Sequence, residues 1–339
     1  MNILVTGGAG YVGSCLVEDL INKDHHVKCV DRFFMGDQYM KMLAKKSKNL
    51  ALIKDDIRSF SQDILKDVDV VMDLAALSND PAGELDPIKT FEINHKGRVR
   101  VAKLSKKMKV KRYILPSSAS VYGEQKQLAD EKVAPNPLTA YSKANRQAEI
   151  DILKLNDNNF TTTILRFSSL YGKSPRMRFD LAVNNFVLDY FNNGKIIVKG
   201  KNNKRPFLHL KDAITAYGIF LEAPKNKIGG EIFNVGSAKQ NYVVGDLANE
   251  VAKSLDSNCE IDSGDTQDNR SYFASFEKIE KTFGFQAKFT VENGSKEIFD
   301  ALKNNELEFS ERMITVKWYA KLLQNPEEYK ELLINGVML

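Results

Sequence analysis

The chain of 339 residues has little of what builds metal centres and disulfide frameworks. It contains only 3 cysteines, at positions 15, 29 and 259, and only 4 histidines. Cysteines so few and so scattered exclude a disulfide scaffold and a zinc site, and they are typical of proteins in a reducing cytoplasm. We therefore predict a cytoplasmic protein that needs no metal.

Long apolar runs are also missing. No segment approaches the roughly 18 apolar residues that cross a bilayer. A strand is predicted within the first residues, which leaves no room for a signal peptide, so we expect no membrane partner.

Charge of one sign is in only slight excess, with a formal net charge of +5. Basic clusters occur at residues 41–48 and 103–112. They lack the interleaved aromatic residues that stack on nucleic-acid bases, which favours solvated helix faces and argues against a nucleic-acid partner. A modest basic excess also suits an anionic small substrate.

The most informative pattern lies at the start of the chain. Residues 1–6 predict a short buried strand, and apolar residues at helical spacing follow a glycine-rich turn. Gly8, Gly10 and Gly13 in that turn fit G-x-G-x-x-G. Glycines there let a pyrophosphate approach the N-terminus of the helix. Strand, turn and helix together indicate a dinucleotide-binding βαβ unit.

A second predicted strand, residues 26–30, ends at Asp31, 18 residues after Gly13. An acid at about this distance accepts hydrogen bonds from the adenosine ribose of a dinucleotide. The alternative, a glycine-rich turn with an incidental acid, fits the combined pattern less well.

Strand-like and helix-like segments alternate through the first half, which predicts an α/β fold: a Rossmann-type, doubly wound parallel sheet with helices on both faces. The expected strands are 50–54, 68–74, 112–116 and 161–167, and the expected helices are 87–108 and 141–155. Later elements are expected at 180–192, 195–199, 210–222 and 231–235.

The second half predicts a smaller α/β lobe that binds substrate. We expect an NAD-binding domain at 1–173, with 207–237 returning to it, and a substrate-binding domain at 174–206 and 238–339.

Motifs at the strand ends carry a family resemblance. They are PSSASVYG at 116–123, YSKAN at 141–145, LRF at 165–167, LYG at 170–172, RPFLHLKD at 205–212 and FNVG at 233–236. With residues 6–14, they resemble the extended short-chain dehydrogenase/reductase family, in particular its NAD-dependent nucleotide-sugar epimerases and dehydratases of the UDP-glucose 4-epimerase type. The likeness covers nearly the whole chain.

The resemblance implies that NAD is the cofactor, because Asp31 would hold the ribose and repel the 2′-phosphate of NADP. Arg32 beside it is the one feature that softens this preference. The cofactor contacts that the family pattern implies are Gly7, Gly10, Tyr11, Val12, Gly13, Asp31, Arg32, Asp56, Ile57, Leu74, Ala75, Ala76 and Tyr141.

The same resemblance implies catalytic roles for Ser118, which would bind the sugar hydroxyl undergoing oxidation, and Tyr141, which would exchange its proton. For Ser118, a hydroxyl that only bonds its own backbone is the alternative. The implied substrate contacts are Ser118, Ser120, Asn185, Arg205 and Arg270. Both arginines suit a diphosphate because their planar forks pair two oxygens at once.

Three further residues stay open at this stage. Asn94 matches a helix asparagine of the family, although a solvent-facing or capping role fits equally well. Arg176 and Arg178 flank the expected substrate region, but surface salt bridges explain them as well.

The chain departs from the family at its catalytic helix, where Tyr-x-x-x-Lys is usual and Tyr141-x-x-x-Asn145 stands here. Residues four apart share a helix face, so Asn145 and not Lys143 neighbours Tyr141. A free tyrosine has a pKa of ~10 and is about one part in a thousand phenolate at pH 7. We expect a weaker base, and we expect Asn145→Lys to raise activity at neutral pH or shift the pH profile toward acid.

Ser118 is followed by Ala119 and Ser120, where the family's dehydratases carry an Asp-Glu pair. This favours reversible C4 epimerisation of a nucleoside-diphosphate hexose through a transient 4-keto sugar. The alternatives are a nucleotide-4-keto-sugar reductase or dehydratase, and a non-catalytic paralogue that binds NAD and the nucleotide sugar. Related proteins dimerise through the helices at 87–108 and 141–155, so a homodimer is expected.

Overall fold

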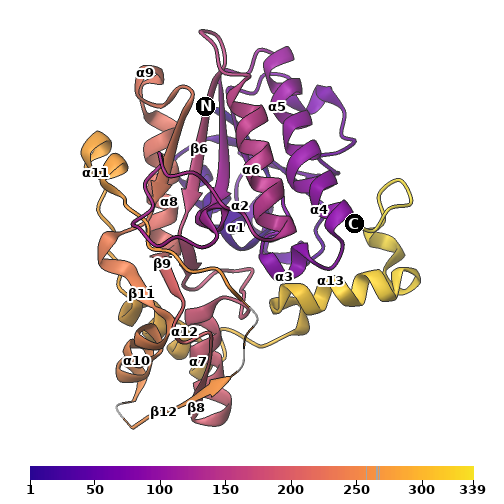
Figure 1. Cartoon of the computed structure of the whole chain (residues 1–339). Helices are drawn as coiled ribbons and strands as arrows, with labels where there is room; N and C mark the ends of the chain where they lie inside the picture. Colours follow the sequence, from indigo (N-terminus) through magenta and orange to yellow (C-terminus); the bar gives the residue numbers. More distant parts are fainter. Residues whose placement is uncertain (257, 265, 267) are drawn as a thin grey trace.

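The computed structural model describes residues 1–256, 258–264, 266 and 268–339, and its centre is a seven-stranded sheet (Figure 1). The strands follow the order β10-β6-β5-β4-β1-β2-β3, and every neighbouring pair is parallel. Their bounds are β1 Asn2–Thr6, β2 His26–Asp31, β3 Leu50–Lys54, β4 Val70–Asp73, β5 Arg112–Ser118, β6 Thr161–Phe167 and β10 Glu231–Val235. The predicted doubly wound fold is confirmed.

Helices cover both faces of this sheet and form two separate cores. On one face lie α1 (Tyr11–Asn22), α2 (Gln38–Lys46) and α8 (Leu210–Glu222). On the other lie α5 (Arg98–Lys107) and α6 (Ala140–Leu153). Because both faces are covered, the central strands are largely buried, and β6 is buried along its whole length even though it carries Thr161, Thr162, Thr163 and Arg166.

The predicted helix 87–108 is divided into three parts. It consists of α4 (Pro87–Phe91), a π-helical turn at Glu92–Gly97 and α5. Asn94 lies in the wide turn, fully buried, and hydrogen bonds both the backbone N–H and the carbonyl of Leu77 at 2.8 and 3.0 Å. This contact with a distant loop answers the open question about Asn94, and π-turns often occur at functional sites.

The second lobe is smaller and lies beyond the carboxyl ends of the main strands (Figure 1). It contains α7 (Ala182–Asn193), α10 (Val244–Leu255) and α12 (Val291–Lys303), with β8 (Lys195–Lys199) paired to β12 (Glu260–Gly264). A three-stranded sheet of β7 (Ser169–Tyr171), β9 (Lys204–His209) and β11 (Asn241–Val243) connects it to the main body. Short helices complete the chain: α3 (Asp80–Gly83), α9 (Lys225–Ile228) and α11 (Glu277–Phe283).

The C-terminal segment does not belong to this lobe, although the predicted boundary places it there. Helix α13 (Thr315–Gln324) and the residues after it pack on the main domain beside α3 (Figure 1). Trp318 donates from its indole nitrogen to the carbonyl of Phe34 at 2.8 Å. Within the described part of the chain, no helix combines the length and apolar character needed to cross a membrane.

Candidate active site

A large cavity of about 870 Å³ runs along the carboxyl ends of the main strands and into the smaller lobe. It brings together every residue predicted for the site except Asn145. The members in its wall are Gly7, Gly10, Tyr11, Val12, Gly13, Asp31, Arg32, Asp56, Ile57, Leu74, Ala75, Ala76, Ser118, Ser120, Tyr141, Asn185, Arg205 and Arg270. Ligands of open α/β sheets bind at this edge.

The glycine loop is packed so closely that side chains have no room. A Cβ on Gly13 would lie 2.2 Å from the carbonyl oxygen of Gly7, and one on Gly7 would lie 2.8 Å from the backbone nitrogen of Ala75. Gly7 also has a φ of +65°. Helix α1 starts directly after this loop, and no side chain caps its N-terminus at Gly10. Backbone N–H groups at that end are therefore available for a pyrophosphate, so the loop fits the dinucleotide.

The adenosine end of the cavity holds Asp31, whose carboxylate accepts from the backbone N–H groups of Ala9 and Phe33 at 2.9 and 2.7 Å. Burial raises its pKa. Arg32 points elsewhere: its guanidinium pairs with Asp56 at 2.8 Å and donates to C-terminal backbone carbonyls. In this structure the guanidinium of Arg32 is engaged by Asp56 and by these carbonyls, which favours a structural role for it over contact with a 2′-phosphate.

We expect Asp31→Asn to weaken NAD binding about tenfold, because a neutral amide replaces a charged acceptor for the ribose hydroxyls. Binding of NADP should stay weaker than that of NAD, since Arg32 remains paired with Asp56. Isothermal titration of both dinucleotides would check this. Equal affinity of the variant for the two would contradict it and show that Arg32 reaches a 2′-phosphate.

The central part of the cavity holds Ser118 at the end of β5 and Tyr141 in the first turn of α6. Thr139 caps that helix and fixes its start, and Tyr141 lies with Ser118 in the wall of the same cavity. Ser118 Oγ also accepts from the backbone N–H of Ser120 at 3.1 Å. The hydroxyl of Ser120 is buried and has no partner among the described residues, as expected for a group that awaits a ligand.

Burial and Asp80 raise the pKa of Tyr141, whereas Arg98, Ser118 and Arg178 lower it. Arg98 is the residue that sequence reasoning missed. It lines the cavity, and its Nη1 donates to Asn145 Oδ1 at 2.8 Å, with Asn145 itself behind it. The sequence carries one signal that Arg98 faces the site, because Arg98 follows the inward-facing Asn94 by one helical turn.

The two arginines expected to hold a diphosphate lie at the lobe end of the cavity. Asp268 bridges them, at 3.1 Å from Arg205 and 2.6 Å from Arg270. Arg270 also pairs with Asp80 from the main domain. Asn185 on α7 lies in the same wall and donates to Asp189 at 2.9 Å.

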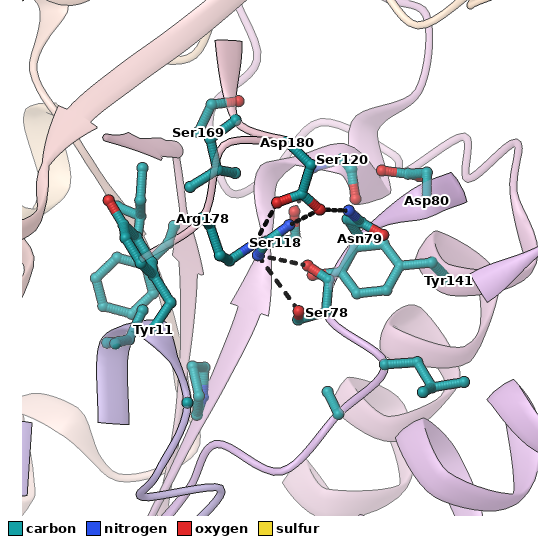
Figure 2. A pocket seen from close by; sticks show the side chains of 18 of the residues that line it. Tyr11, Ser78, Asn79, Asp80, Ser118, Ser120, Tyr141, Ser169, Arg178 and Asp180 are labelled. Carbon is teal, nitrogen blue, oxygen red and sulfur yellow. Dashed lines mark hydrogen bonds and ion pairs between the residues drawn. The ribbon is translucent and has the colours of Figure 1, made fainter. Parts of the chain in front are cut away.

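Arg178 lies in a second group of polar residues beside Tyr141. The sequence left a surface salt bridge as an alternative explanation of Arg178, and that alternative is wrong. Its side chain is buried and forms a two-pronged pair with Asp180 at 2.9 and 3.0 Å (Figure 2). Ser78 and Asn79 complete the group, and Tyr141 points toward it (Figure 2). Arg176 also lines the cavity and donates to Thr315 at 3.1 Å.

Comparison with known proteins agrees with this geometry. The model of the NAD-dependent epimerase/dehydratase family matches residues 3–236, and the chain therefore belongs to that family. This membership confirms the family that the sequence motifs predict, and it confirms NAD as the cofactor.

Two relatives and one solved structure show how wide the likeness is. A putative UDP-glucose 4-epimerase of Methanocaldococcus jannaschii is 27% identical over 314 residues, which span 89% of this chain and 99% of that protein. UDP-glucuronic acid decarboxylase 4 of Arabidopsis thaliana is also 27% identical, over 87% of this chain and 67% of its own. The structure of UDP-glucuronic acid 4-epimerase from Bacillus cereus with NAD is 25% identical with a TM-score of 0.79, covering 91% of this chain and 100% of that one.

Proposed function

We propose that this protein is an NAD-dependent epimerase that inverts C4 of a nucleoside-diphosphate hexose. The proposal rests on one observation. Tyr141 and Ser118 stand in one cavity between a dinucleotide-binding glycine loop and a pair of arginines suited to a diphosphate. Its relatives named above as 4-epimerases, at 25–27% identity, support the same reaction class.

The carboxylates near Tyr141 speak against elimination of a hydroxyl, which needs a protonated acid. Arg178 pairs with Asp180 and holds its pKa below the usual range. Asp80 is paired with Arg270 and accepts from Thr139. Asp180 is therefore held as an anion and is not poised to protonate a leaving hydroxyl, and both oxygens of Asp80 already have partners.

NAD, when bound, supplies the acceptor and later the donor of the hydride. The residues of the chain handle the proton and the position of the sugar. Ser118 holds the O4 hydroxyl, and the Tyr141 phenolate takes its proton as the C4 carbonyl forms. Tyr141 returns the same proton after the 4-keto sugar has presented its opposite face, so no proton is consumed overall.

The sugar has to turn while the nucleotide stays fixed. In this proposal Arg205 and Arg270 bind the diphosphate through their planar guanidinium groups, both of which pair with Asp268 in the structure. Arg178, Ser78 and Asn79 offer donors on the far side of the sugar site. Anchoring at one end and several alternative donors at the other would suit a flat intermediate that rotates.

The test is incubation of purified protein and NAD with UDP-, dTDP-, GDP- and CDP-hexoses, with UDP-glucuronic acid in a separate arm. An epimeric product without net change in NADH absorbance supports the proposal. Stoichiometric loss of NADH would favour a reductase, and release of carbon dioxide from the uronic acid a decarboxylase. Bound NAD with no product across the panel would favour the non-catalytic paralogue.

The homodimer and the cytoplasmic location stay predictions from the sequence. Light scattering of the purified protein would measure its mass, and a monomeric value would contradict the dimer. Ile88 on α4, within the first of the helices predicted to pair, is exposed.

A further inference from the structure

Arg98 is an unusual residue for the interior of a protein. It is the first residue of α5, only 2% exposed, and yet its side chain reaches the wall of the central cavity. Burying a guanidinium costs several kcal/mol unless its donors are satisfied, so such a residue is kept for a reason. The contacts of the Arg98 guanidinium indicate this reason.

The contacts of Arg98 are all neutral acceptors. Nη1 donates to Asn145 Oδ1 at 2.8 Å, and Nη2 donates to the backbone carbonyls of Asp73 and Pro116 at 2.9 and 2.8 Å. Its Nε has no partner among the described residues. Among the residues that the structure describes, no carboxylate is hydrogen bonded to this guanidinium, so its charge is held in place without being neutralised at contact.

Asn145 occupies the position where the family usually has a lysine, but it does not reach the cavity. It is 1% exposed and lies behind Arg98, and its Nδ2 is buried without a partner in the described part of the chain. A lysine here would place an ammonium against the guanidinium. A short neutral acceptor instead gives the guanidinium a fixed docking point.

The field of this guanidinium reaches the catalytic hydroxyl. Among the groups that lower the pKa of Tyr141, Arg98 has the largest effect, ahead of Ser118 and Arg178. Burial and Asp80 act in the opposite direction and leave that pKa raised overall.

Other ionisable groups surround the pair and bear on its titration. They are Asp73 on β4, Asp80 on α3, Tyr113 on β5, Tyr217 on α8, and Arg178 and Tyr272 from the lobe side. The Asp73 carboxylate accepts hydrogen bonds from Thr6 and Tyr113, and the charge of Arg98 lowers its pKa against the larger effect of burial.

We propose that Arg98, docked on Asn145, is the positioning cation of this active site and stabilises the Tyr141 phenolate in place of the family's lysine. The inference rests on the proposed function for the identity of the base. The charge has moved from helix α6 to helix α5, and Asn145 holds it there instead of acting on the cofactor itself.

The first experiment compares Arg98→Gln with the charge-conserving Arg98→Lys. Without a cation, kcat at neutral pH should fall about 10- to 100-fold, and the acid limb of the pH profile should move upward by about one to two pH units. KM should change little, since Arg98 does not hold the diphosphate. Arg98→Lys should keep most of the wild-type profile. An unmoved profile in Arg98→Gln would overturn the proposal.

A measurement without turnover separates this inference from the proposed function. Ultraviolet difference titration of the NAD-bound protein, with Tyr141→Phe as background, reports ionisation of Tyr141 alone. Its pKa should rise in Arg98→Gln even if no sugar tested is a substrate. If sugars are epimerised but this titration does not move, the inference fails while the function stands.

If Arg98→Gln does not fold, Asn145→Asp tests the role of Arg98 instead. This variant is nearly isosteric and leaves Arg98 in place, but its carboxylate cancels the guanidinium charge at contact. The acid limb and the Tyr141 titration should again move upward. A fully active variant with an unchanged titration would overturn the proposal.

Relocating the charge gives the sharpest contrast. Asn145→Lys alone should lower the thermal midpoint and give no gain in activity, because two buried cations then meet; this reverses what the sequence suggests. The double variant Arg98→Gln, Asn145→Lys should recover at least about tenfold of the activity lost in Arg98→Gln. Greater activity of Asn145→Lys with Arg98 present would contradict the assignment.

Discussion

Tyr141→Phe is expected to abolish epimerisation almost completely, with kcat reduced by about 1,000-fold or more. A positioned proton acceptor contributes roughly 100- to 10,000-fold to a rate, and phenylalanine has no hydroxyl to take up the proton. The phenyl ring keeps the packing of the first turn of α6, so thermal stability should change little. Steady-state rates with the best sugar of the panel would measure the loss.

A matched control is Tyr217→Phe. Tyr217 lies on α8, is buried in the same cavity wall and stacks on Phe167 at 5.0 Å. It has no part in the proton transfer, so its variant should keep activity within about threefold, well under the 1.4 kcal/mol of a tenfold change. Residual activity of Tyr141→Phe above one tenth of wild type would show that another group takes the proton.

The pH dependence follows from the same residue. Because the phenolate is the active form, the rate should rise as pH increases through the pKa of Tyr141, which burial and Asp80 keep above that of an ordinary tyrosine. The profile should lack this limb in any variant at position 141. A limb that persists in Tyr141→Phe would assign it to a different group.

Much of the fold follows from the sequence because local pattern and tertiary structure agree in it. The predicted segments 161–167, 195–199, 210–222 and 231–235 have the bounds observed for β6, β8, α8 and β10. In β8 and α8 the apolar period also predicts which face is buried.

The parts that escaped prediction depend on contacts between residues far apart in the chain. The π-turn at Glu92–Gly97 is tied to Leu77 by Asn94, and C-terminal residues after Gln324 reach back to Arg32. No local period encodes either contact. The contacts between Arg32 and the C-terminal segment are also the reason why both differ from what the sequence predicts.

The candidate site shows the same division. Residues of the family motifs, such as Gly13, Ser118 and Tyr141, were predicted because their neighbours in the chain identify them. Arg98 was not, since its importance arises from Asn145, 47 residues later, which it meets only in the folded protein. A departure at one motif position was visible in the sequence, whereas its compensation was visible only in three dimensions.

Glu149 gives the largest expected effect on stability. It is fully buried on α6 and accepts from Ser117 on β5 at 2.6 Å, while Arg166 on β6 donates to both its oxygens at 2.9 and 2.7 Å. Arg146 adds a third cationic donor at 2.9 Å. These contacts fix the helix that carries Tyr141 against the strand that carries Ser118.

The substitution Glu149→Gln replaces the carboxylate by a neutral amide. It leaves the guanidinium of Arg166 buried without its counter-charge, which typically costs about 3–5 kcal/mol. We therefore expect a loss of that size in the free energy of unfolding by urea at neutral pH, and a drop in activity with it. Glu292→Gln is the matched control, because its exposed partner Lys296 lies one turn away on α12 and such pairs contribute about 0.5 kcal/mol or less.

The pH dependence of this loss identifies its electrostatic origin. Arg166, Ser117 and Arg146 hold the pKa of Glu149 below its usual value in the folded protein, against the effect of burial. A lowered folded-state pKa gives stability that is complete above the unfolded value of about 4.3 and disappears as pH falls through the folded one. The gap between wild type and Glu149→Gln should therefore be constant from pH 8 to about pH 5 and shrink at lower pH. A gap that stayed constant into acid would mean that Glu149 acts through packing and not through its charge, and the alignment of Tyr141 with Ser118 would then need another support.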